Sequence, residues 1–329
     1  MNAAMPMTPL LEVTGLKKHF PLKRSWLGAS TGQVHAVDGV SFHIDRGETL
    51  SLVGESGCGK STVGRSVLRL FDLTAGEVRL DGQRIDNLSA RQLRPLRRNL
   101  QVVFQDPFAS LNPRMTVRDA LAEPVGNFEP ALPAASVQAR VDELLDLVRL
   151  PRDAARRYPH EFSGGQRQRI CIARALASRP QLLICDEAVS ALDVSVKAQI
   201  VNLLQDLQAE LGLALLFISH DLGIVEHMTH RVAVMYLGRI VEQGTARKLF
   251  GSPRHPYTQA LLSAAPGNAK AGKRIVLKGD VPSPVNPPAG CHFHTRCPHA
   301  FERCRSEAPP LEDKGDGQWA ACHLQALPT

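Results

Sequence analysis

The chain has 329 residues, of which 43% are hydrophobic and 22% are charged, a size and composition that allow one sizeable domain with its own apolar core plus an appendage. No run of roughly 18 apolar residues occurs, and the start MNAAMPMTPLLEV lacks the basic and apolar regions of a secretory signal, so we expect a cytosolic protein. The formal net charge is +7, but the arginines are scattered rather than arranged in a stripe, which does not indicate specific nucleic-acid binding.

Short β-like runs come first: LLEVTGL, VDGVSFHI and EVRLDG predict a small antiparallel sheet. Three later apolar runs, ETLSLV, QLLICD and LALLFISH, each end where polar residues begin, which is typical of buried parallel strands joined by helices. Residues 106–160 change to a helical pattern with several prolines and predict an inserted helical subdomain. From about residue 251, turn- and proline-rich sequence indicates a linker and a small terminal module. Together these patterns predict an α/β fold.

The first motif with chemical meaning is a phosphate-binding loop. GESGCGKS fits the pattern G-x-x-x-x-G-K-[ST], with the strand-like ETLSLV before it and the helix-like STVGRSVLRL after it. Its glycines let backbone N–H groups close around phosphate oxygens, and the helix N-terminus adds positive potential. Lys60 is expected to reach the β- and γ-phosphates, and the Ser61 hydroxyl to bind Mg²⁺. The predicted ATP-binding residues of this loop are Gly54, Glu55, Ser56, Gly57, Cys58, Gly59, Lys60, Ser61 and Thr62.

Polar residues follow three further apolar runs. In LLICDE, Asp186 is expected at the carboxyl end of a strand, where it can hold the magnesium shell, and Glu187 can polarise an attacking water as a general base. His220 ends LALLFISH, where an imidazole can hydrogen-bond the γ-phosphate. Gln105, in VVFQDPF, can bind magnesium or water and lie at a hinge before the helical subdomain.

A second glycine turn, SGGQ, opens the long helix SGGQRQRICIARALASR. Ser163 is a good N-cap, and Gly164 and Gly165 leave backbone amides open to an anion. The alternative is a simple helix start whose glycines allow close packing. Because the chain has no internal repeat and no second phosphate loop, a second cradle predicts a dimer in which each chain's turn caps the nucleotide of its partner.

In this order, the motifs resemble those of the ATP-binding subunits of ABC transporters, over essentially residues 10–250. GESGCGKS is similar to the Walker A motif, Gln105 to the Q-loop, FSGGQ to the signature, LLICDE to Walker B, SALD to the D-loop and His220 to the H-switch. Phe162 and Ala188 depart from the residues that many members carry, Leu and Pro.

The resemblance implies a P-loop NTPase fold with a RecA-like parallel-sheet core, an antiparallel β subdomain and a helical subdomain at about residues 106–178. It further implies Mg²⁺-dependent ATP hydrolysis, in which Glu187 is the catalytic base, His220 the γ-phosphate clamp and Gln105 a magnesium ligand. Asp193 of the D-loop would make a contact across the dimer, and Gln166 of the signature would contact the ATP bound by the partner chain. Phe20, in LKKHF, matches the aromatic residue that stacks on adenine, with core packing as the alternative.

Four of the seven cysteines crowd the end of the chain: Cys291, Cys297, Cys304 and Cys322, spaced C-x5-C-x6-C-x17-C. In a reducing cytosol such a crowd suggests a metal site rather than disulfides. Four thiolates suit a [4Fe–4S] cluster or tetrahedral Zn²⁺. Nearby histidines keep mixed Cys/His zinc ligation open, and reduced packing thiols are the third alternative; these histidines are His292, His294, His299 and His323.

HPYTQALLSA and VPSPVNPPAGCHFHTRCPHAFERC resemble one branch of the family, the ATPase subunits of dipeptide, oligopeptide and nickel importers. The resemblance implies two parts, an ATP-binding domain over residues 1–250 and the branch's C-terminal extension over residues 251–329, and a role at the cytoplasmic face of the membrane. The implied partners are a second, related ATPase subunit, two permease subunits and, indirectly, a solute-binding protein. Alternatives are a nickel or other small-solute importer, an ABC exporter, a nucleotide-binding cassette without chemistry, or a soluble ABC ATPase associated with nucleic acid.

Overall fold

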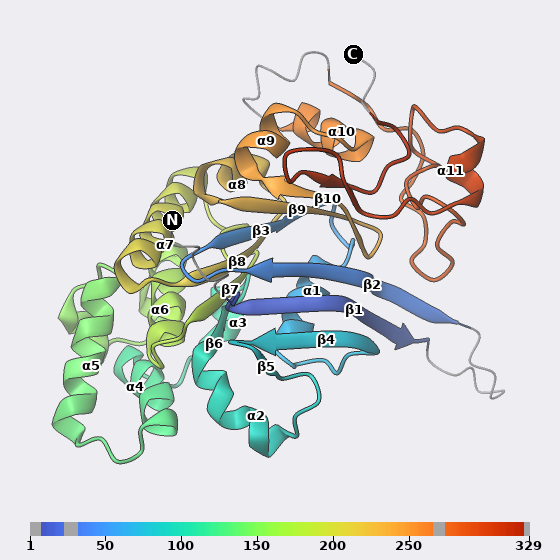
Figure 1. Ribbon diagram of the computed structural model, residues 1–329. Coiled ribbons are helices and arrows are strands. Elements are labelled where there is room, and N and C mark those ends of the chain that lie inside the picture. Colours follow the sequence, from blue (N-terminus) through green and yellow to red (C-terminus); the bar gives the residue numbers. More distant parts are fainter. Residues whose placement is uncertain (1–7, 23–31, 266–273, 326–329) are drawn as a thin grey trace, which may run out of the picture. The chain divides into compact units, whose positions relative to one another are not determined.

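The computed structural model describes residues 8–22, 32–265 and 274–325, which include every predicted site residue (Figure 1). The chain divides into two compact units. The first joins residues 1–44, 49–86 and 219–329, and the second joins residues 45–48 and 87–218. Each unit is therefore assembled from segments that lie far apart in the sequence.

The antiparallel sheet predicted near the N-terminus is confirmed in the first unit, with the strand order β2-β1-β4-β5. Along β1 the side chains of Leu11, Val13 and Leu16 are buried, whereas Glu12 is exposed. The pairing register shifts between Val13 and Leu16, where Gly15 has φ +57°, so one extra residue turns Leu16 to the buried face. The strands are β1 (Leu11–Pro21), β2 (Gln33–Ile44), β4 (Ala75–Leu80) and β5 (Gln83–Arg84).

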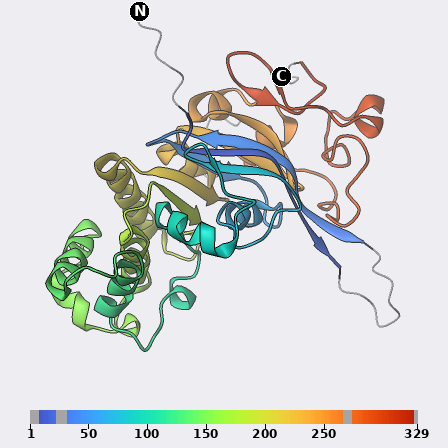
Figure 2. The ribbon, with the colours of Figure 1, turned by 60° about the horizontal axis from the view of Figure 1, so that its bottom comes forward.

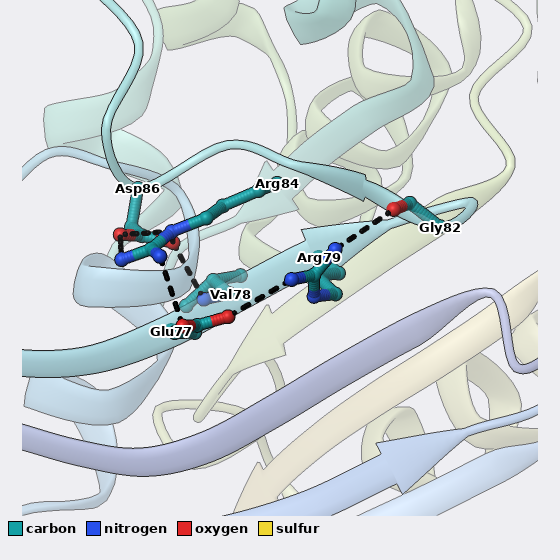
Figure 3. A network of polar contacts seen from close by, with 6 residues as sticks. All are labelled: Glu77, Val78, Arg79, Gly82, Arg84 and Asp86. Carbon is teal, nitrogen blue, oxygen red and sulfur yellow. Dashed lines mark hydrogen bonds and ion pairs between the residues drawn. The ribbon is translucent and has the colours of Figure 1, made fainter.

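A network of arginine and carboxylate side chains holds the β4–β5 hairpin together (Figure 3). Arg84 donates through Nη1 to Glu77 at 2.8 Å and through Nη2 to Asp86 at 2.9 Å. Asp86 also accepts from the backbone N–H of Val78 at 2.9 Å. Burial raises the pKa of Asp86, but these hydrogen bonds lower it by more, so the group stays ionised. Charge-assisted bonds thus hold an edge strand whose backbone ladder is short.

A further set of paired strands in the first unit is mixed. β3 (Thr49–Val53) is parallel to β9 (Arg231–Tyr236), and β9 is antiparallel to β10 (Arg239–Thr245). Near the end of the chain, β12 (Trp319–Ala320) pairs with β10 and with β11 (Glu312–Asp313). The helices of this unit are α1 (Lys60–Val67), α8 (Leu222–Met228), α9 (Ala246–Gly251), α10 (Pro256–Ala264) and α11 (Glu302–Ser306).

The start of the predicted linker is in fact helical. His255 caps α10 by accepting from the N–H of Tyr257 at 3.1 Å, and Pro256 occupies the first helical turn. Tyr257 is fully buried, and its ring centroid lies 4.8 Å from that of Tyr236 and 5.4 Å from that of Phe293. Proline is as suitable for the first turn of a helix as for a linker, so composition alone does not distinguish the two.

In the second unit, β6 (Leu100–Val103), β7 (Leu182–Asp186) and β8 (Ala214–Ser219) run parallel, with β7 between the other two. Every residue of β7 and β8 is buried, which confirms QLLICD and LALLFISH as buried parallel strands. Around them lie helices α2 (Ala90–Leu96), α3 (Pro107–Ser110), α4 (Val117–Phe128), α5 (Ala134–Leu147), α6 (Gly164–Leu176) and α7 (Val194–Leu211), and 3-10 turns at Arg97–Asn99, Arg152–Arg156 and Pro159–Glu161.

The predicted helical insertion is confirmed as helical structure within this unit. Helices α4, α5 and α6 pack against one another, and both ribbon views show them side by side (Figure 1, Figure 2). Thr116 caps α4 by accepting from the N–H of Asp119 at 3.2 Å. Val117, Leu121 and Val125 then recur every four residues and are all buried, which gives the helix one apolar face.

Candidate functional site

The phosphate loop runs from the end of β3 to the start of α1 in the first unit. Gly54 has φ +152°, and a Cβ there would lie 2.2 Å from the carbonyl oxygen of Met235. Gly59 caps α1 with φ +106°, and its Cβ would lie 2.1 Å from the carbonyl oxygen of Ala36. Neither position can hold a side chain, because fixed backbone would collide with it. Close packing against two other segments therefore sets the course of the loop.

Lys60 is the first residue of α1, and its side chain lies along the loop. The residue is 4% exposed, and its ammonium group donates to the carbonyl oxygens of Gly54 at 2.8 Å and Glu55 at 3.0 Å. Ser61 and Thr62 follow in the first turn of the helix. A lysine beside the N–H groups of a helix start is an arrangement that binds phosphate.

The sequence did not indicate what holds the loop in place. The backbone N–H of Glu55 donates to the hydroxyl of Tyr257 at 2.9 Å, and the Glu55 carboxylate pairs with Arg296 at 2.7 Å and 3.1 Å. The carbonyl of Cys58 accepts from the N–H of Gly238 at 3.0 Å. These partners are 180 to 241 residues away in the chain, so spacing within a motif cannot reveal them.

In the second unit, parallel strands bring three of the predicted site residues, Gln105, Asp186 and Glu187, to one sheet edge. Asp186 is the last residue of β7 and is 5% exposed. Glu187 follows it with φ +51°, a left-handed conformation that is uncommon for a residue with a side chain. Its backbone is held there, because its N–H donates to Ile218 at 3.0 Å and its carbonyl accepts from the N–H and hydroxyl of Ser190. Gln105 lies two residues beyond the end of β6, at the same edge, and is exposed.

His220 follows the last residue of β8 and is exposed. The next residue, Asp221, caps α8 by accepting from the N–H of Ile224 at 3.4 Å. His220 therefore lies at the end of a buried strand, as the sequence predicts, and in a short turn that leads to α8. It groups with Lys60 in the first unit, whereas Gln105, Asp186 and Glu187 group in the second.

The second glycine turn, residues 163–166, caps α6 as predicted. Ser163 accepts from the N–H of Gln166 at 3.3 Å, and the Gln166 side chain accepts from the N–H of Ser163 at 3.0 Å. The two glycines differ in their surroundings. A Cβ on Gly165 would lie 2.5 Å from Cγ1 of Val196 in α7, but a Cβ on Gly164 would meet only Cδ2 of Leu192, at an ordinary 3.7 Å. Close packing thus explains Gly165 and leaves Gly164 unexplained.

Asp193 and Phe20 lie at surfaces of their units. Asp193 is exposed and precedes α7 without its side chain capping the helix. Phe20, on β1, is half-buried, and its ring contacts Phe71 edge-on at a centroid distance of 5.3 Å. The Lys18 ammonium lies 4.9 Å from the Phe20 centroid. Both adenine stacking and packing on Phe71 are compatible with this partial exposure.

The four terminal cysteines lie near one another in the first unit. The N–H of Cys291 donates to the carbonyl of Cys304 at 2.8 Å, and Cys304 is 8% exposed. Burial raises the pKa of Cys297 to about 11, and the neighbouring Cys322, Cys291 and Cys304 raise it too. Two of the candidate histidines have other partners: His294 Nδ1 pairs with the carbonyl of Cys291, and His323 Nε2 with that of Glu307.

A second group of possible metal ligands lies elsewhere in the first unit. Within the described residues, the ligand atoms of His19, His35 and Asp38 all lie within 4.8 Å of one another. By donor type, the four terminal thiols match either a cluster of several irons or tetrahedral zinc.

In this three-residue group, the Asp38 carboxylate is paired with cationic side chains of the protein. Arg239 donates to Asp38 at 2.7 Å, and the Lys17 ammonium lies 3.4 Å from the other carboxylate oxygen. Burial raises the pKa of Asp38, but Arg239 and Lys17 lower it by more, to about 2. We therefore interpret this group as an ion-pair network between β1, β2 and β10, and not as a metal site.

Two family models match the chain: "ABC transporter" over residues 37–190 and "Oligopeptide/dipeptide transporter, C-terminal region" over residues 241–304. A probable peptide ABC transporter ATP-binding protein of Sinorhizobium fredii is 56% identical over 96% of this chain and 90% of its own length. The oligopeptide transport ATP-binding protein AppF of Bacillus subtilis is 52% identical over 98% of this chain and 99% of its own length.

Solved structures show the same similarity. The ATP-binding cassette MJ0796, in a dimeric post-hydrolysis state bound to ADP and Pi, matches with a TM-score of 0.64 and 28% identity, covering 72% of this chain and 99% of that one. The protein cbiO1 of Clostridium perfringens, part of the ABC transporter complex cbiONQ, matches with a TM-score of 0.63 and 30% identity, covering 74% and 91%.

The fold and the phosphate loop define a P-loop nucleoside triphosphatase of the ATP-binding cassette type. Given relatives that are more than half identical over nearly its whole length, the chain belongs to the ABC transporter ATP-binding proteins. Among the described residues, no helix has both the length and the apolar character needed to cross a bilayer.

Proposed function

We propose that this chain is the ATP-hydrolysing subunit of a peptide importer, and that it works as a peripheral protein at the cytoplasmic face of the membrane. The observation that carries the proposal is a phosphate loop with a buried Lys60 in a chain whose C-terminal region matches the oligopeptide/dipeptide transporter family. Relatives named for peptide or oligopeptide transport favour peptides over nickel as the solute. The division into an ATP-binding domain over residues 1–250 and an extension over 251–329 stays a prediction.

In the proposed site, the N–H groups of residues 54–62 hold the phosphates of ATP, and Lys60 turns from its loop carbonyls to the β- and γ-phosphates. Ser61, Asp186 and Gln105 would hold Mg²⁺ and its water shell, and the bound ion supplies charge neutralisation on the phosphates. Phe20 would stack on the adenine.

Hydrolysis requires a water held in line with the γ-phosphorus. The Glu187 carboxylate accepts the proton of this water as its oxygen bonds to phosphorus, and the bond from phosphorus to the bridging oxygen of ADP breaks. His220 donates a hydrogen bond to the γ-phosphate and so senses its departure. The held, left-handed backbone of Glu187 supports this role, because strained conformations concentrate where a side chain must be aimed.

The proposed site is completed by a second ATPase chain, a related one in our proposal. The turn at residues 163–166 and Asp193 would contact the nucleotide bound by the partner. Packing within the chain does not require a glycine at position 164, and Asp193 is exposed; both observations support this arrangement. The dimeric MJ0796 structure, bound to ADP and Pi, shows that a similar cassette forms dimers.

The importer would further contain two permease subunits and a separate solute-binding protein. Phe108 supports a permease contact near Gln105, because this phenylalanine is 64% exposed and the Arg167 guanidinium lies 3.9 Å from its ring centroid. An exposed aromatic ring held in place by a cation is a common element of protein interfaces. The four cysteines would hold a [4Fe–4S] cluster with a structural role, since no redox partner is indicated.

The test is the substitution Glu187→Gln, which keeps the size of the side chain but removes the base. We expect ATP turnover to fall by about 100-fold or more, in line with the usual contribution of a general base. ATP binding should remain, and the trapped ATP should stabilise a dimer that size-exclusion chromatography with multi-angle light scattering detects.

The matched control is Glu210→Gln, an exposed glutamate near the end of α7, which should leave turnover and dimerisation as they are. Unchanged turnover in Glu187→Gln would refute the role of this carboxylate. Absence of ATP binding by the unmodified chain would refute the proposed function as a whole.

A further inference from the structure

The C-terminal cysteine segment, residues 290–322, contacts the phosphate loop through one arginine. Arg296 donates through Nη1 to Oε2 of Glu55 at 2.7 Å and through Nη2 to Oε1 at 3.1 Å, a two-point contact with both carboxylate oxygens. The Arg296 side chain is 9% exposed and that of Glu55 is 29% exposed. A paired, mostly buried contact of this kind constrains orientation far more than a surface ion pair does.

An aromatic cluster below the loop fixes the position of Arg296. Phe293 is 1% exposed, and its ring meets Tyr236 edge-on at a centroid distance of 5.2 Å. The N–H of Arg296 donates to the carbonyl of Phe293 at 3.0 Å, which ties the arginine to this anchor through a tight turn. The Arg296 guanidinium also lies 5.9 Å from the Tyr236 ring centroid. The guanidinium therefore has few alternative positions.

Glu55 is the second residue of the loop, and both its backbone and its side chain are held. Its N–H donates to the Tyr257 hydroxyl, while its carboxylate binds Arg296. Tyr257 and Arg296 both fall within the residues that match the oligopeptide/dipeptide transporter C-terminal family. Cys297 directly follows Arg296, so the same short stretch serves both the loop and the cysteine site.

We propose that Arg296 is a positioning residue for the phosphate loop, through which the folded cysteine segment sets the affinity for ATP. The inference rests on the proposed function, since it takes residues 54–62 as the ATP-binding loop. Arg296 does not act on the phosphates itself, because its guanidinium is engaged by the Glu55 carboxylate. It preorganises the loop and lowers the cost of ordering it around the nucleotide.

The experiment compares Arg296→Met, which removes the charge but keeps the length, with Arg296→Lys, which keeps the charge but loses the two-point contact. The dissociation constant of a fluorescent ATP analogue and the separate kcat and KM values are measured. We expect Arg296→Met to raise the dissociation constant and KM about tenfold with kcat changed by less than about twofold, and Arg296→Lys to fall between it and the unmodified chain. The matched control is Arg305→Met, a largely exposed arginine that follows Cys304.

A double-mutant cycle decides whether Arg296 acts through Glu55. Glu55→Gln alone should weaken ATP binding to a similar extent, and Arg296→Met should then add less than about twofold. Additive effects, or unchanged binding in both single variants, would overturn the proposal. If Arg296→Met fails to fold, Glu55→Gln and Arg296→Lys give the same decision, because neither removes the cysteine segment's anchor.

Hydrogen exchange supplies a readout besides binding. Coupling between two sites acts in both directions, so ATP binding should slow amide hydrogen exchange in residues 290–304 of the unmodified chain. This protection should be lost in Arg296→Met. Equal protection in both would contradict the coupling. Lys60→Ala tests the proposed function independently, because it should abolish ATP binding whether or not Arg296 positions the loop. A failure of the proposed function can therefore be distinguished from a failure of the Arg296 proposal.

Discussion

At the scale of single residues, the ion pairs of the first unit show how far burial and neighbouring charges shift the pKa of a side chain. Asp38 accepts hydrogen bonds from both Nε and Nη2 of Arg239, and its side chain is only 12% exposed. Burial raises its pKa, and the cations Arg239 and Lys17 lower it by more, from 3.8 to about 2. A carboxyl group whose pKa is lower in the folded state stabilises the fold wherever it is ionised.

This shift predicts a pH dependence of stability. The contribution of Asp38 is present above pH 3.8, amounts to about 2 kcal/mol at pH 7, and is lost as the pH falls towards about 2. Urea unfolding of the unmodified chain and of Asp38→Asn should therefore differ most at pH 7, with about half of the difference remaining at pH 3. Asp280→Asn, at an exposed position, is the control. A difference that does not change with pH would show that the charge of Asp38 is not responsible.

At the scale of elements, the two glycines at the head of α6 have separate reasons to be small. Gly165 faces α7 so closely that a methyl group would collide with Val196, a β-branched side chain with little freedom to move. Gly164 has room for a methyl group, so packing within the chain does not require a glycine there.

The different surroundings of Gly164 and Gly165 predict that alanine has different effects at the two positions, on ATP turnover at the first and on stability at the second. Gly165→Ala should lower the free energy of unfolding by about 1–3 kcal/mol through overpacking, and Val196→Ala in the same chain should restore most of it. Gly164→Ala should leave the thermal midpoint unchanged but lower ATP turnover about tenfold or more, because the methyl group would face the partner's nucleotide. Full turnover in Gly164→Ala would argue against a nucleotide site shared between two chains.

At the largest scale, the C-terminal region contributes structure to the first unit. It adds the strand β12 beside β10, places Tyr257 against the phosphate loop, and gathers four thiols. Burial raises the pKa of Cys291 and of Cys322, so these groups are protonated thiols at neutral pH when no cation is bound to them.

Metal analysis of anaerobically purified chain tests the cluster. We expect about four irons and about four acid-labile sulfides per chain, the content of a [4Fe–4S] cluster, and their loss in Cys297→Ser. Cys171→Ser is the control, since burial raises the pKa of this core thiol to about 11 and it lies in the second unit. Stoichiometric zinc without iron, or no metal at all, would contradict the proposal.

The local motifs can be read from short stretches of the sequence. The phosphate loop, the cap at Ser163 and the buried strands ending at Asp186 and Ser219 follow from short patterns, because backbone geometry and periodic burial depend on neighbours in the chain. The distant groups that contact these motifs are known only from the folded chain. Arg296 on Glu55, Val196 beside Gly165 and Arg239 on Asp38 are contacts across 31 to 241 residues. No local pattern encodes such contacts, because they arise when apolar burial brings whole elements together.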